Sequence, residues 1–171
     1  MNNKMSGLRW TVLALACAAI PVSCLAAGTQ AKSVATKPAG GKQVERGRYL
    51  VMIAGCNDCH TRNFLVTGGK TPEQDRLTGD ALGWRGPWGT TYPVNLRLYF
   101  QDMTEEQWVH VAKEIQRRPP MPYFSLNAMA EADVRAIYKY IRYLGPAGVP
   151  APKFLPADKE PPQPYVQFPA Q

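Results

Sequence analysis

The sequence has few cysteines and histidines, and no long apolar segment beyond its N-terminal region. It contains four cysteines and two histidines among 171 residues, and Cys17 and Cys24 lie near the start. A four-cysteine zinc site would need every cysteine in the chain. No later stretch approaches the ~20 apolar residues of a transmembrane helix. No internal repeat is visible, and the 20 basic residues form no run of five or more. The net charge of +7 therefore indicates a solvated basic surface or steering toward an acidic partner, and not nucleic-acid binding.

The N-terminal region has the layout of a secretory signal peptide. Lys4 and Arg9 precede an uncharged run at 10–20, and a proline and several small residues follow. We therefore expect residues 1–27 to be a signal peptide and the protein to be exported to the periplasm. The alternatives are an uncleaved N-terminal anchor and a lipidated Cys24. The chain that remains has the length of one domain.

The residue pattern that organises the sequence is Cys56-Asn57-Asp58-Cys59-His60. It reads C-x-x-C-H, the pattern by which a c-type haem is attached. Cys56 and Cys59 each form a thioether with a vinyl group of the porphyrin, and His60 supplies the proximal imidazole to the iron. A C-x-x-C pair also occurs as a redox dithiol or as half of a zinc site. The adjacent histidine and the preceding helical pattern favour one covalently bound haem c.

Hydrophobic periodicity and turn residues divide the rest of the chain. Residues 28–42 are rich in Gly, Ala, Lys, Ser and Thr, which predicts a flexible leader. Seven prolines lie in 147–171, a tail that we expect to lack regular structure and either to strap over the domain or to extend from it. Between them, the pattern predicts three helices and one long loop, at 43–54, 104–117, 131–144 and 61–95 respectively.

The long loop carries the candidate haem-pocket residues. Indole, guanidinium, phenol and amide groups can donate hydrogen bonds to the carboxylates of a haem. The candidates in the loop are Trp84, Arg85, Trp88, Tyr92 and Asn95. In the alternative interpretation, the two tryptophans only cover the haem edge and Arg85 faces water.

Met121 is the candidate distal ligand of the iron. It stands in the run Pro119-Pro120-Met121-Pro122, and prolines stiffen the backbone around it. A thioether is a weak ligand, so a loop that already holds the sulfur lowers the entropic cost of binding. The rivals are Met129, His110 and an open site. We expect His110 to be a solvated residue on a helix surface, and Met103 to pack against the start of the second predicted helix as a hydrophobic staple.

The order of these elements resembles a class I (monohaem) cytochrome c over Gln43 to Leu144, which implies a cytochrome c domain at 43–146. Finer details resemble a single module of the cytochrome c subunits of membrane-bound alcohol and gluconate dehydrogenases. The matching segments are Gly47-Arg48-Tyr49-Leu50, Pro87-Trp88-Gly89-Thr90, Tyr92, Asn95-Leu96, Met121-Pro122-Tyr123 and Asp133-Val134-Arg135-Ala136-Ile137-Tyr138. The family usually has Thr where this chain has Arg97.

The resemblance implies an all-α fold of about three main helices and long loops around one haem. It also implies that the first and last helices cross, with Gly47 against Ile137 and Tyr140. The expected function is electron transfer, with axial ligands His60 and Met121 and no substrate transformed. The expected partners are a donor dehydrogenase and an acceptor oxidase or reductase. The alternatives are a dedicated subunit of a dehydrogenase complex, and a haem whose open site binds or reacts with small ligands.

Overall fold

A computed structural model describes residues 41–169. The expected signal peptide, Cys24 and most of the expected leader lie outside the described residues, so these assignments stay predictions. The described elements are α1 (Lys42–Ile53), α2 (Cys56–His60), the 3-10 helix η1 (Glu73–Asp75), β1 (Gly83–Gly86), β2 (Gly89–Thr91), α3 (Leu96–Tyr99), α4 (Glu105–Glu114), α5 (Tyr123–Ala128), α6 (Glu131–Leu144) and β3 (Tyr165–Gln167).

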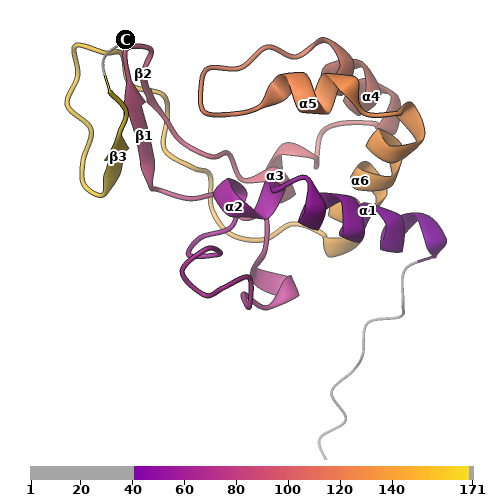
Figure 1. Cartoon of the computed structure of the whole chain (residues 1–171). Helices are drawn as coiled ribbons and strands as arrows, with labels where there is room; N and C mark the ends of the chain where they lie inside the picture. The colour runs from indigo at the N-terminus through magenta and orange to yellow at the C-terminus, as the bar shows by residue number, and fades with distance from the viewer. Residues whose placement is uncertain (1–40, 170–171) are drawn as a thin grey trace, which may run out of the picture. The chain divides into compact units, whose positions relative to one another are not determined.

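The crossing of α1 and α6 forms the centre of the hydrophobic core (Figure 1). A Cβ atom on Gly47 would overlap the backbone carbonyl of Ala136 and lie 2.7 Å from the Cβ of Tyr140, so only glycine allows the helices to approach this closely. The crossing predicted from Gly47 is confirmed at Tyr140. The core consists of Leu50, Val51, Leu77, Phe100, Trp108, Ala112, Val134, Ala136, Ile137, Tyr140 and Ile141. Within residues 41–169, no helix has both the length and the apolar character needed to cross a bilayer.

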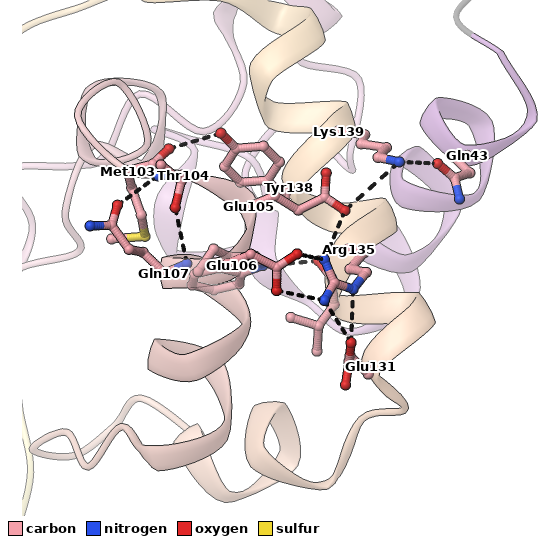
Figure 2. Close-up of polar contacts among 12 residues, drawn as sticks. Gln43, Met103, Thr104, Glu105, Glu106, Gln107, Glu131, Arg135, Tyr138 and Lys139 are labelled. Atoms are coloured by element: carbon pink, nitrogen blue, oxygen red, sulfur yellow. Dashed lines mark hydrogen bonds and ion pairs between the residues drawn. The ribbon is translucent and has the colours of Figure 1, made fainter.

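Helix α4 begins with the capping box that the sequence predicts. The Thr104 hydroxyl accepts from the backbone N–H of Gln107 at 3.2 Å, and the Gln107 side chain accepts from the Thr104 N–H at 2.8 Å. Figure 2 shows this cap beside the contacts that join α4 to α6. Arg135 of α6 pairs with carboxylates on both helices, and the Tyr138 hydroxyl donates to the Met103 carbonyl at 2.8 Å. These polar contacts thus lie beside the apolar contact between α4 and α6 and join the two helices.

Helix α4 ends at Glu114, three residues before the predicted end at 117. Ile115 turns into extended backbone. The side-chain amide of Asn127 in α5 donates to the carbonyls of Ala112 at 2.8 Å and Ile115 at 3.3 Å. These are carbonyls that a helix end leaves without intrahelical partners. Helix α5 therefore folds back on α4, and the segment between them becomes a closed loop that contains Met121.

The prediction of an all-α class I cytochrome c fold with about three main helices is wrong. The described residues form six α-helices and a three-stranded mixed sheet with the strand order β2-β1-β3. Strands β1 and β2 pair antiparallel, with Gly86 opposite Gly89 and only Pro87 and Trp88 between them. Gly89 has φ +97°, which a tight turn requires. The interpretation of 61–95 as a loop without strands missed this hairpin because each strand is only three or four residues long.

The third strand comes from the proline-rich tail. Strand β3 runs parallel to β1, with Gly83 opposite Tyr165 and Arg85 opposite Gln167. Figure 1 shows the yellow C-terminal segment beside β1. The expectation that this tail lacks regular structure is therefore wrong at 165–167, and of its two alternatives the strap is confirmed. Prolines exclude a helix, but an edge strand needs ladder hydrogen bonds on one side only.

The close contact at Gly47 predicts that adding one methyl group there greatly lowers the stability of the fold. Gly47→Ala should lower the free energy of unfolding by about 3 kcal/mol, because the α1–α6 contact is too tight to admit a Cβ atom without backbone movement. Urea unfolding followed by circular dichroism measures this. Gly41→Ala is the matched control, since no atom lies within 4 Å of that Cβ position, and it should cost no more than about 1 kcal/mol. Equal stability of the two variants would contradict the close crossing.

Candidate functional site

The C-x-x-C-H segment folds as the short helix α2, directly after α1. Gly55 separates the two helices with φ +68°, a conformation that glycine adopts without strain. Cys56, Cys59 and His60 thus lie within five consecutive helical residues. The predicted helix stop at Gly55 is confirmed. This arrangement keeps the two thiols and the imidazole close together, as attachment of one planar cofactor requires.

His60 is buried, at 9% exposure, and is held by a backbone carbonyl from a distant segment. Its Nδ1 lies 2.8 Å from the carbonyl oxygen of Val94. A carbonyl only accepts, so Nδ1 carries the proton and donates, and the lone pair of Nε2 is left for a metal. Burial lowers the pKa of His60 below its ordinary value, although the Val94 carbonyl acts in the opposite direction. The imidazole is therefore neutral at neutral pH, which is the state that binds iron.

The two thiols are protonated and weakly reactive. Burial raises the pKa of Cys56 to about 11, and burial, together with the charge of Asp58, raises the pKa of Cys59. Catalytic and redox-active cysteines have lowered pKa values, because the thiolate is the nucleophile. The described residues contain no group of three or more His, Cys, Asp or Glu side chains placed to hold a metal ion. The raised pKa values thus argue against a redox-active dithiol at this pair.

The β1–β2 hairpin presents several buried polar atoms that lack partners. Within the described residues, the Nε1 atoms of Trp84 and Trp88, the Thr90 hydroxyl and the Tyr92 hydroxyl make no hydrogen bond. Unpaired buried donors are costly, and their presence points to a missing acceptor. Burial also raises the pKa of Tyr92, so its hydroxyl stays protonated and able to donate. Carboxylates of a haem are acceptors of the right kind for these groups, so the residues present fit a c-type haem.

The other two predicted pocket residues have partners in the chain. Arg85 forms an ion pair with Glu160, and its guanidinium lies over the ring of Tyr165. Asn95 caps α3 by accepting from the Leu98 N–H at 3.1 Å. Its amide nitrogen donates to the carbonyls of Ala147 at 2.8 Å and Val149 at 3.1 Å. Both residues therefore support the protein scaffold, and their place in a haem pocket stays a prediction.

Arg97, which stands where the family that the sequence resembles usually has Thr, has a structural role in this chain. It is 4% exposed, and burial lowers its pKa. The guanidinium donates to the carbonyls of Gln74 at 2.8 Å and Leu144 at 2.6 Å, and to that of Gly145. A cation at the C-terminus of a helix satisfies its last carbonyls and the helix dipole. The sequence pattern gave no sign of this role, because the partners are backbone atoms of distant segments.

Met121 lies half-buried in the loop between α4 and α5, which extends toward the strands in Figure 1. The Thr91 hydroxyl donates to the carbonyl of Pro119 at 3.0 Å. The hairpin thus contacts both the Met121 loop and, through Val94, His60. Of the rivals, Met129 packs against the hydrophobic core, and His110 is exposed as predicted. Met103 also packs against the core, as expected of a staple residue.

Two residues around the motif were missed by sequence reasoning. Asn57 and Thr61 are each 1% exposed. The Thr61 hydroxyl donates to the Asn57 side-chain oxygen at 2.8 Å and accepts from the backbone N–H of Leu77 at 2.8 Å. The i, i+4 spacing of two polar residues was the available signal, but nothing in the sequence identified Leu77 as the third member. This network fixes the end of α2 next to His60.

Comparison with known proteins finds one distant relationship to a cytochrome. The chain is 26% identical over 154 residues to the fructose dehydrogenase cytochrome subunit of Gluconobacter japonicus. The similarity covers 81% of this chain but only 30% of that protein, so the chain spans less than a third of its relative. No family model matches the chain, and no solved structure matches it. The similarity supports a cytochrome c-like relationship but does not single out a monohaem class I module.

The Thr61 network predicts a specific loss of stability. Thr61→Val should lower the free energy of unfolding by about 2 kcal/mol, because it leaves the Leu77 N–H and the Asn57 oxygen buried without a partner. Thr61→Ser keeps the hydroxyl and should recover most of that loss. Urea midpoints of the three proteins provide the measurement. A valine variant as stable as the serine variant would show that the network contributes little.

Proposed function

We propose that this chain is an electron-transfer protein of the periplasm that carries one covalently bound c-type haem. The observation that carries the proposal is the buried His60 on α2, whose Nδ1 is fixed by the Val94 carbonyl. When bound, the haem supplies one-electron exchange between Fe(III) and Fe(II). In this proposal the chain transforms no substrate itself. Its distant similarity to a dehydrogenase's cytochrome subunit supports a carrier role.

Each group of residues has a defined task in this proposal. Cys56 and Cys59 hold the cofactor covalently, so it is not lost during repeated encounters with partners. His60 offers Nε2 to the iron from a fixed orientation, because Nδ1 donates to a backbone carbonyl. Met121 would supply a thioether ligand to the iron and would keep small molecules away from it. The unpaired donors of the hairpin, Trp84 among them, bind the carboxylate edge of the cofactor.

A permanent subunit of a dehydrogenase complex is the second candidate. The relative from Gluconobacter japonicus is by name the cytochrome subunit of fructose dehydrogenase. In this alternative the chemistry at the iron is the same, but the donor enzyme stays bound. The partner in either case is a dehydrogenase that passes on electrons, and an oxidase or reductase accepts them. Purification of the tagged chain from its native host separates the two candidates: a dehydrogenase present in stoichiometric amount favours the subunit, and a lone cytochrome favours the mobile carrier.

Axial ligation is the decisive test. The purified ferric holoprotein should show a sulfur-to-iron absorption band if the Met121 thioether is a ligand of the iron. Met121→Ala should abolish this band, and Met129→Ala, the matched control, should retain it since Met129 packs against the hydrophobic core. Loss of the band in the Met129 variant alone would reassign the ligand. A high-spin spectrum of the unaltered protein would instead support an open site that binds small ligands.

A further inference from the structure

The C-terminal segment is a fixed part of the candidate site. Thr90 and Leu155 exchange two backbone hydrogen bonds, of 2.8 and 3.0 Å. Further along, the N–H of Phe168 donates to the carbonyl of Arg85 at 2.8 Å. The Phe168 ring packs against Trp84 and Trp88, with centroid distances of 6.1 and 5.3 Å. The segment from 155 to 168 is therefore fixed to the hairpin at both of its ends.

Phe154 is where this segment reaches the Met121 loop. The guanidinium carbon of Arg118 lies 4.0 Å from the centroid of the Phe154 ring, the shortest cation–π distance among the described residues. The edge of the ring also approaches Gly89, where a Cβ atom would lie 2.8 Å from it. Because Gly89 has no side chain, the Phe154 ring can pack against the hairpin. The aromatic face of Phe154 in turn contacts the guanidinium of Arg118.

The Met121 loop is consequently held from two sides. On one side, Arg118 contacts Phe154 and the Pro119 carbonyl accepts from Thr91, three and two residues before the methionine. On the other side, α5 begins directly after Pro122 and is fixed to α4 by Asn127. A thioether is easily displaced, so its retention depends on how often the loop opens. Contacts present only in the closed loop reduce the opened fraction.

We propose that Arg118 and Phe154 are positioning residues that keep the Met121 loop closed, so that the C-terminal segment limits the access of external ligands to the iron. The inference rests on the proposed function, since it assumes that Met121 is an iron ligand. Neither residue touches the cofactor in this proposal. Both act through the backbone of the loop. The proline-rich tail thereby gains a role in protecting the redox centre, beyond completing the sheet.

Imidazole binding to the ferric holoprotein tests the proposal. Imidazole displaces a thioether, and the loss of the sulfur-to-iron band reports its apparent affinity. Phe154→Leu, which keeps an apolar side chain but removes the aromatic face, should raise this affinity roughly twofold to fivefold, as expected for an exposed cation–π contact. Arg118→Gln should have a similar effect. The imidazole affinity of the double variant should be close to that of each single variant, because the two residues act as one contact. The unliganded spectrum of each variant should be unchanged.

The neighbouring exposed Arg117 supplies the control. Arg117→Gln removes the same charge from the same loop and should leave the imidazole affinity unchanged. Tryptic cleavage after Arg117 gives a readout independent of the iron, and it should be faster in Phe154→Leu. If all the proteins show the sulfur band and also bind imidazole with equal affinity, the inference is overturned and the proposed function stays intact. An equal effect of Arg117→Gln would also overturn it, because charge alone would then explain the result. Absence of the band in the unaltered protein would reject Met121 as the ligand and both proposals with it.

Discussion

The hydrogen bond between His60 Nδ1 and the carbonyl of Val94 connects the local chemistry of the motif to the rest of the protein. It selects the tautomer of the imidazole and fixes the plane of the ring. It also places the base of the hairpin beside α2, and with it the unpaired donors of β1 and β2. At the same end of the hairpin, Thr91 contacts the loop that carries Met121. One backbone carbonyl therefore sets the register between three segments that are far apart in sequence.

Local features of the chain were predictable from the sequence. The capping box of Thr104, the stop at Gly55 and the extent of α6 depend on neighbouring residues, and sequence patterns record such neighbours directly. The close crossing at Gly47 was also predictable, because glycine in a helix interior is costly and needs a packing reason. The C-x-x-C-H pattern is local in the same way, because the haem attachment expected of it requires a short and fixed spacing.

Features that depend on distant pairing were not predictable. The hairpin strands are too short to show alternation, and β3 lies among prolines, so no periodic signal marks any of them. Arg97 and Asn127 both bind backbone carbonyls, which every residue possesses and no sequence pattern identifies. The Val94 carbonyl that accepts from His60 is likewise a backbone atom that no sequence pattern identifies. The sequence thus offered candidates for the site residues, whereas the partners that orient these residues became visible only in three dimensions.

The sheet and the helix crossing both join segments that are far apart in the described chain. Arg85 meets Glu160 across 75 positions, and Arg46 of α1 meets Asp133 of α6 across 87. Contacts between distant residues form slowly, because a large loop must close before they yield any stabilisation. The pairing of β3 with β1 is such a contact, and we therefore expect the third strand to join the sheet late in folding.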